Sequence, residues 1–210
     1  MNIMKKIKIK ICGQNNPAII NHCLDLNISY QGLIFYEKSP RFIDTDTLAL
    51  VNQYFRSHKN RFVGVFVNPT INEIKNQLSI FDFDTIQLHG DESQDLINEV
   101  KKNFKKKIYK SISPEDFEKT NLINVDKYLI EAKPSSNQMP GGNNKTWKWD
   151  NFKNSKKLPY ILSGGLNVTN IKKAISLTGA NFVDINSGVE EKPGEKSLSL
   201  IDSIVSSIYN

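Results

Sequence analysis

Short apolar segments recur along the whole chain, and polar or amphipathic segments separate them. They are rich in isoleucine, valine, leucine and aromatic residues, and their length of roughly four to six residues is typical of buried β-strands. The pattern predicts eight strands, at Ile7–Cys12, Leu33–Tyr36, Val63–Val67, Thr85–His89, Lys107–Ser111, Lys127–Glu131, Tyr160–Ser163 and Phe182–Asn186.

Apolar residues spaced at three and four positions fill most of the intervening segments, which indicates amphipathic helices. The predicted helices are Pro17–Leu26, Thr45–His58, Ile71–Phe81, Ser93–Phe104, Pro114–Leu122, Val168–Thr178 and Leu198–Ile208. The segment Pro134–Lys157 is instead rich in asparagine, glycine and serine, so we expect a loop there.

Strands that alternate with helices indicate a parallel α/β sheet, because a parallel pair needs a long crossover connection. An open doubly wound sheet and a closed (β/α)8 TIM barrel both satisfy this alternation. Eight units in 210 residues, with no linker or shift in composition, favour the barrel as a single domain over residues 1–210. In such a barrel the chemistry lies where the strands end.

Composition narrows the class of protein further. Hydrophobic residues make up 39% and charged residues 24%, as in a soluble globular protein, and no apolar run is long enough to suggest a membrane span. The net charge of +6 raises the question of nucleic acid. The densest basic run, Lys101–Lys107, follows a helical pattern, so a solvated helix end is favoured over a phosphate funnel or an RNA patch. We therefore expect no nucleic-acid or membrane partner.

The beginning of the chain also bears on location. Met1–Lys6 is basic, but the isoleucines of Ile7–Ile11 alternate with lysine and form no apolar signal segment. Two cysteines are too few for a disulfide scaffold. A cytoplasmic protein is expected.

The first predicted strand carries a candidate base. Its alternation places Ile9 and Ile11 on one face, and Lys10 and Cys12 on the other. A neighbouring ammonium stabilises a thiolate, so Lys10 is expected to lower the pKa of Cys12 and make it a base or nucleophile. A small buried cysteine with no chemical role is the alternative. Cys23 lies within an apolar helical pattern and is expected in the core.

Three further ionisable residues stand at or within strand ends. Glu131 ends the sixth apolar run, where desolvation is expected to raise its pKa and make it an acid. Asp184 lies between apolar residues and needs a partner, either a substrate hydroxyl or Lys10. His89 ends the fourth run, where a core histidine is the alternative to a functional one.

The chain offers no spacing that suggests a metal. The histidines are too scattered to form a ligand set with one another or with the cysteines, so we predict no metal site. They are His22, His58 and His89.

Glycine-containing segments end the last two strands. Ser163–Asn167 includes Gly164 and Gly165, and Ser187–Glu190 includes Gly188. In barrels the loops after strands seven and eight often bind phosphate through backbone N–H groups, which glycine allows an anion to approach closely.

One other glycine pair invites a P-loop interpretation. It fails, because Asn144 precedes Lys145 and no strand leads into Gly141–Thr146. The nearby Trp147 and Trp149 either stack on an aromatic ligand or anchor this loop to the core.

Taken together in chain order, these segments resemble the phosphoribosylanthranilate isomerase family of tryptophan biosynthesis. The matching segments are Lys8–Gly13, Gly32–Arg41, Val63–Asn68, Gln87–Glu92, Gly141–Gly142 with Lys145–Thr146, Leu162–Asn167, and Val183–Glu190 with Pro193–Gly194. They span nearly the whole chain, so the match is specific as a set.

The resemblance implies an Amadori rearrangement of N-(5-phosphoribosyl)anthranilate to 1-(2-carboxyphenylamino)-1-deoxyribulose 5-phosphate. It implies that Cys12 is the base and that Arg41 binds the anthranilate carboxylate, for which a guanidinium is well suited. His89 and Asp184 would contact the substrate, and phosphate would lie on Gly164, Gly165, Ser187 and Gly188. The resemblance implies no cofactor and no metal, and a monomer or a homodimer.

The chain departs from the family pattern at the acid. The family has aspartate where this chain has Glu131, so the carboxyl lies one methylene further out. We expect Glu131 to be the acid, with Asp126 a remote second choice, and Asn143–Asn144 to replace a usual Thr/Ser-Gly pair. Two alternatives remain: a catalytically impaired sugar-phosphate-binding barrel, which Glu131 motivates, and a related isomerase of histidine biosynthesis, which Cys12 disfavours.

Overall fold

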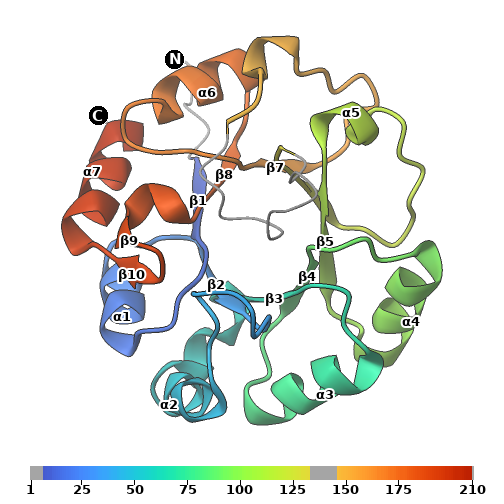
Figure 1. The fold of residues 1–210 in the computed structure, drawn as a ribbon, viewed down its shortest axis with the longest axis vertical. Helices are drawn as coiled ribbons and strands as arrows, with labels where there is room; N and C mark the ends of the chain where they lie inside the picture. Colours follow the sequence, from blue (N-terminus) through green and yellow to red (C-terminus); the bar gives the residue numbers. More distant parts are fainter. Residues whose placement is uncertain (1–6, 133–145, 210) are drawn as a thin grey trace.

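A computed structural model describes residues 7–132 and 146–209 of the chain, and in it eight parallel strands form a closed barrel. Each strand pairs with the next, and β8 closes the ring by pairing with β1, with helices packed outside (Figure 1). The barrel strands are β1 Lys8–Ile11, β2 Tyr30–Ile34, β3 Phe62–Phe66, β4 Thr85–Leu88, β5 Lys107–Ile112, β6 Lys127–Ile130, β7 Tyr160–Leu162 and β8 Phe182–Ile185. The predicted (β/α)8 barrel is confirmed, and the open sheet is wrong.

Helices connect consecutive strands around the outside of the ring (Figure 1). The α-helices are α1 Pro17–Asp25, α2 Thr45–Phe55, α3 Ile71–Ile80, α4 Gln94–Phe104, α5 Pro114–Phe117, α6 Ile171–Thr178 and α7 Leu198–Tyr209. Three 3-10 segments are η1 Arg56–Arg61, η2 Trp149–Asn151 and η3 Ser187–Val189, and a hairpin joins β9 Glu190–Lys192 to β10 Glu195–Lys196. Within the described residues, every helix is too short or too polar to cross a membrane.

Side-chain caps explain where several helices begin. The side chains of Asp44, Thr70, Ser93 and Ser113 each accept a hydrogen bond from the backbone N–H three residues later. Each cap satisfies one N–H group that the first helical turn leaves without an intrahelical partner. These polar residues lie between the strand ends and the helices, where the chain turns from the barrel into the outer helical layer.

The alternation in β1 sorts its side chains between two layers. Ile9 and Ile11 pack into the layer between the barrel and the helices, whereas Cys12, just beyond the strand, belongs to the cluster inside the barrel. Lys10 is fully buried. The predicted division of this strand is confirmed.

The second strand lies earlier than the sequence pattern indicates. The prediction was Leu33–Tyr36, but β2 runs from Tyr30 to Ile34. Gln31 and Gly32 interrupt the apolar pattern, although both are buried in the strand. Gln31 is accommodated because its amide oxygen accepts a hydrogen bond from Gln14 at 2.9 Å.

Helix ends account for the remaining corrections. The predicted helix Thr45–His58 is α-helical only to Phe55 and continues as η1, and Val168–Thr178 begins at Ile171. The predicted Pro114–Leu122 stops at Phe117, and the following turn is held by the Tyr128 hydroxyl, which donates to the Leu122 carbonyl at 2.9 Å. The hairpin of β9 and β10 was not predicted, because its short strands are largely polar.

Candidate active site

A buried ion pair forms the floor of the site. Lys10 in β1 stands in register with Asp184 in β8, and its Nζ lies 2.8 Å from Asp184 Oδ1. Burial works to lower the pKa of Lys10, but Asp184 and Cys12 outweigh it and hold this pKa above its usual value. Lys10 is therefore a permanent cation inside the barrel, and Asp184 has the ion-pair partner that the sequence suggested.

Cys12 lies directly after β1, beside the Lys10 ammonium. Burial raises the pKa of its thiol, and Asp184 adds to this effect, whereas Lys10 and Lys196 act in the opposite direction. The net pKa is raised. The sequence-based prediction of a lowered pKa is wrong, because the effect of complete burial exceeds that of one ammonium already paired with a carboxylate.

Glycine makes room for these two groups. A Cβ atom at Gly32 in β2 would lie 2.8 Å from Cys12 Sγ and 3.0 Å from Lys10 Nζ. Both distances are shorter than ordinary van der Waals contact with carbon. The residue that hid the start of β2 is thus the one that leaves space for the thiol.

Glu131 and His89 meet across the ends of β6 and β4. Glu131 Oε1 lies 2.6 Å from His89 Nε2 and accepts a hydrogen bond from Ser111 Oγ at 2.9 Å. Within the described residues Nε2 has no hydrogen bond of ordinary geometry, so the contact with His89 is a close ion pair. On the other side of the imidazole, Gln87 Nε2 lies 2.8 Å from Nδ1.

This contact reverses the expected ionisation of Glu131. Burial acts to raise its pKa, but His89, Ser111 and Lys10 together hold the pKa below its usual value. Burial acts to lower the pKa of His89, but Glu131 outweighs it and the pKa is raised. The expectation of a raised pKa for Glu131 is wrong, because the pair favours imidazolium and carboxylate.

Arg41 is held by the carboxylate of Glu190, for which the sequence predicted no role. Its Nε and Nη2 donate to Glu190 Oε1 and Oε2 at 2.8 and 2.7 Å. Lys196 Nζ lies 2.6 Å from Glu190 Oε1 and donates to Asn186 Oδ1 at 2.7 Å. Lys196 comes from the unpredicted β10, which explains why sequence reasoning missed this network.

The ends of β7 and β8 touch one another. Gly164 and Gly165 have φ values of 93° and 62°, in the left-handed region that favours glycine. A Cβ atom at Gly188 would overlap the Leu166 carbonyl oxygen. The predicted phosphate-binding residues therefore lie together at the same mouth of the barrel as Cys12, with Ser187 starting η3 beside Gly188.

A second buried carboxylate, also missed, secures the loop after β4. Glu92 accepts hydrogen bonds from the backbone N–H groups of Asn68 and Gly90, each at 2.9 Å. Its Oε2 also lies 3.0 Å from Lys110 Nζ. This clamp ties the segments that follow β3 and β4 to β5, and one of its N–H donors, Gly90, directly follows His89 in the chain.

The two tryptophans anchor the chain around β7. Trp147 Nε1 donates to the Ser163 carbonyl at 3.0 Å, and Trp149 is buried in the core. Of the two interpretations, the structure gives anchoring. The predictions for Gly141–Gly142 and for Asn143–Asn144 fall outside the described residues, as does the first half of the predicted loop Pro134–Lys157, whose described half contains η2.

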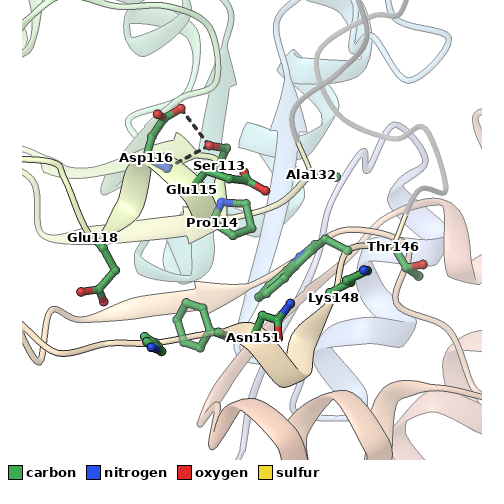
Figure 2. A pocket seen from close by; sticks show the side chains of 12 residues that line it. Ser113, Pro114, Glu115, Asp116, Glu118, Ala132, Thr146, Lys148 and Asn151 are labelled. Atoms are coloured by element: carbon green, nitrogen blue, oxygen red, sulfur yellow. Dashed lines mark hydrogen bonds between the residues drawn. The ribbon is translucent and has the colours of Figure 1, made fainter.

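Two pockets stand out in the described part of the chain, and their chemistry separates them. The larger, of about 920 Å³, lies between α5 and η2, with Glu115 and Asp116 on one side and Lys148 on the other (Figure 2). None of the predicted site residues lines it. The smaller, of about 40 Å³, is lined by Cys12, Ile34, Tyr36, Ser39, Arg41, Val65, Val67, His89, Glu131, Ser163, Asp184 and Asn186.

Convergence of ionisable groups identifies the smaller pocket as the candidate active site. It brings together every predicted catalytic and substrate-binding residue. Cys23, in contrast, is fully buried against Gln14, which donates to its sulfur at 3.3 Å, as expected of a core cysteine. Within the described residues no group of histidine, cysteine and acidic side chains is arranged to hold a metal.

Comparison with known proteins assigns the family. Residues 9–207 match the sequence profile of N-(5′-phosphoribosyl)anthranilate (PRA) isomerase. The chain belongs to the N-(5′-phosphoribosyl)anthranilate isomerase family. A relative of that name from Rhizobium etli is 34% identical over 97% of this chain and 94% of its own length. Another, from Rhizobium meliloti, is 32% identical over 97% of both chains.

Solved structures of phosphoribosylanthranilate isomerases share the fold. The Thermus thermophilus protein superposes with a TM-score of 0.82 at 20% identity, covering 96% of this chain and 98% of that one. The Thermotoga maritima isomerase gives 0.78 at 25% identity with the same coverage. A third isomerase structure, with a TM-score of 0.76 at 25% identity over 96% and 98%, contains reduced 1-(o-carboxyphenylamino)-1-deoxyribulose 5-phosphate. The resemblance found in the sequence is confirmed, and the chain is an isomerase of this family.

Proposed function

We propose that this chain converts N-(5′-phosphoribosyl)anthranilate to 1-(2-carboxyphenylamino)-1-deoxyribulose 5-phosphate in tryptophan biosynthesis, with Glu131 as acid and Cys12 as base. The observation that carries the proposal is that a thiol, a carboxyl group and an imidazole line one pocket at the carboxyl ends of the strands. A family member with a bound analogue of the product supports the substrate class.

The acid step opens the sugar ring. The Glu131 carboxyl donates its proton to the ring oxygen as the C1–O bond breaks, and the anthranilate nitrogen lone pair forms an iminium with C1. Glu131 is suited to this step because it lines the same pocket as Cys12 and forms an ion pair with His89 at 2.6 Å.

The base step moves hydrogen from C2 to C1. The Cys12 thiolate removes the C2 proton, the bonding electrons neutralise the iminium, and an enolamine results. The thiol then returns the proton to C1 while the enol oxygen loses its own, which gives the ketone. Since burial raises the pKa of Cys12, the thiolate fraction and the rate should rise with pH above neutrality.

The remaining groups bind and orient the substrate. Glu190 fixes the plane of the Arg41 guanidinium, which would bind the anthranilate carboxylate. His89 and Asp184 line the same pocket and would border the sugar. The close approach of Gly188 to Leu166, and the left-handed glycines 164 and 165, support an anion clamp with Ser187.

The oligomeric state and the cellular location of the protein are also part of the proposal. One solved relative from Thermotoga maritima is described as dimeric, and at 25% identity it leaves both a monomer and a homodimer open for this chain. A phosphorylated small molecule is the proposed partner, and a cytoplasmic location remains a prediction.

Loss of phosphoribosylanthranilate fluorescence tests the proposal. We expect turnover by the wild-type protein, and a fall in kcat/KM of about 10²- to 10⁴-fold in Cys12→Ser and in Glu131→Gln, the usual range for a lost acid or base. Cys23→Ser and the surface variant Glu118→Gln are matched controls that should keep kcat/KM. Full activity of Glu131→Gln would overturn the acid assignment, and an inactive wild type would indicate a silent barrel.

A further inference from the structure

Only one oxygen of the Glu131 carboxylate makes polar contacts with the described residues. Its contacts with His89 at 2.6 Å and with Ser111 at 2.9 Å both fall on Oε1. Among the described residues Oε2 makes no ion pair or hydrogen bond, and the residue lines the pocket that holds Cys12. Oε1 therefore contacts the imidazole, and Oε2 is available to a substrate.

His89 is supported in a way that suits two protonation states. The Gln87 amide nitrogen lies 2.8 Å from His89 Nδ1, where its N–H donates to a neutral imidazole. In that form the ring proton is on Nε2, beside Glu131. The Gln87 Oε1 atom is buried without a partner in the described residues. If the amide turns over, this oxygen accepts from the Nδ1–H of an imidazolium, so Gln87 accommodates both forms.

We propose that His89 is a positioning residue that stores the proton for Glu131, so that the pair, rather than the carboxyl group alone, keeps the acid loaded near neutral pH. This inference rests on the proposed function. It assigns His89 a role beyond contact with the substrate.

The proton count closes over one turnover. The Nε2 proton of the imidazolium moves to the Glu131 carboxylate, which gives neutral imidazole and a carboxylic acid. The acid passes this proton to the ring oxygen as the C1–O bond breaks. When the enol becomes a ketone, its hydroxyl proton returns to the pair, while Cys12 moves the C2 hydrogen to C1. No outside acid or base is consumed.

The electrostatics of the pocket agree with this arrangement. Burial disfavours both charged forms, but each partner stabilises the charge of the other, so the pKa of His89 is raised and that of Glu131 lowered. The other titratable or charged groups lining the pocket or acting on the pair are Lys10 on β1, Cys12 directly after it, Tyr36 and Arg41 after β2, and Asp184 on β8. Lys10 and Asp184 affect His89 in opposite directions, which leaves Glu131 as the dominant charge.

Nuclear magnetic resonance measures the pKa of His89, and so tests the pair, in the absence of turnover. The chain has three histidines, so the 13Cε1 signal of His89 in 13C-labelled protein is assigned with His22 and His58 variants. We expect a His89 pKa above 6.5 in the wild type and below 6.5 in Glu131→Gln, where burial and Lys10 lower the pKa and only Asp184 raises it. Equal His89 titration in both proteins would overturn the proposal.

The pH profile of kcat/KM tests the role in catalysis. In His89→Asn the alkaline limb should move to lower pH, with about a tenfold loss above the limb for each pH unit of displacement. Ser111→Ala removes the other contact to Oε1, which lowers the pKa of Glu131, so any movement of the limb in this variant should be to higher pH, opposite to that in His89→Asn. An unmoved limb in His89→Asn, with only KM raised, would leave His89 a substrate-binding residue.

These outcomes separate the inference from the proposed function. An inactive wild-type protein in which His89 still titrates with Glu131 would count against the proposed reaction and not against the pair. An active protein whose His89 titrates independently of Glu131 would do the reverse.

Discussion

At the scale of single residues, Lys10 is the least expected feature of the site. Lysine is almost never fully buried unless it is paired, and Lys10 is completely enclosed in the barrel with Asp184 as its partner. The alternation of β1 predicted its position, and its pairing with Asp184 followed as one of two options. The sign of the Cys12 pKa shift did not, because a sequence gives the neighbours of a thiol but not the degree of its burial.

Breaking this pair should destabilise the protein strongly. Either Lys10→Met or Asp184→Asn leaves one charge buried, and we expect a loss of about 3–5 kcal/mol in the free energy of unfolding. The double variant should recover part of that loss, since neither charge then remains. Urea denaturation measures all three variants.

The exposed pair Lys192–Glu195 is the control. Its atoms are 2.9 Å apart, but the side chains are 68% and 62% exposed and solvent screens the pair, so Lys192→Met should cost far less than Lys10→Met. Similar losses in Lys10→Met and Lys192→Met would show that the buried pair contributes no more than a surface one.

At the scale of elements, glycines account for much of what the sequence pattern missed. Gly32 weakened the apolar signal of β2, so the predicted strand began three residues too late. Glu190 and Lys196 were missed for a related reason, since β9 and β10 are short and polar. Strands that bury both faces are visible as apolar runs, whereas a strand that gives up side-chain volume to a site is not.

Gly32→Ala should therefore affect catalysis more than stability. The added methyl group would lie 2.8 Å from Cys12 Sγ, which must shift, and a displacement near 1 Å costs about a hundredfold in rate. The stability loss from overpacking should be about 1–3 kcal/mol. Steady-state kinetics and urea denaturation of the same preparation compare the two effects.

Gly64→Ala is the matched control on the next strand. Its methyl group would overlap the Phe83 ring, in the layer between barrel and helices, so it should destabilise the fold and leave kcat/KM nearly unchanged. Equal kinetic losses in Gly32→Ala and Gly64→Ala would mean that overpacking acts through general loosening and not through the position of the thiol.

At the scale of the whole molecule, the ring of strands explains why the fold was easier to predict than the site. Eight repeats of strand and helix leave few topologies, and the structure has the closed one, in which β1 pairs with β8. The site depends instead on side chains from β1, β4, β6 and β8, which meet only once the ring is closed. Their ionisation is thus a property of the assembled barrel.

That dependence predicts how stability varies with pH. The carboxylates with lowered pKa stabilise the fold above their unfolded pKa values, and this contribution is lost as pH falls through their folded values. They are Asp44, Glu73, Asp82, Glu118, Glu131 and Glu190. His89 acts with the opposite sign: its contribution is complete below 6.5 and is lost as pH rises through its raised folded pKa.

Stability should therefore be greatest between pH 4.5 and 6.5, the unfolded pKa values of glutamate and histidine. Above pH 9 the buried thiols add a further loss, since the pKa of Cys23 is raised from 9.0 to about 11. Urea midpoints from pH 3 to 10 measure the curve. His89→Asn should be less stable at pH 6 and should lack the decline that begins above 6.5, because no imidazolium remains to be lost. A wild-type decline equal to that of His89→Asn would show that the charge pair with Glu131 does not stabilise the folded barrel.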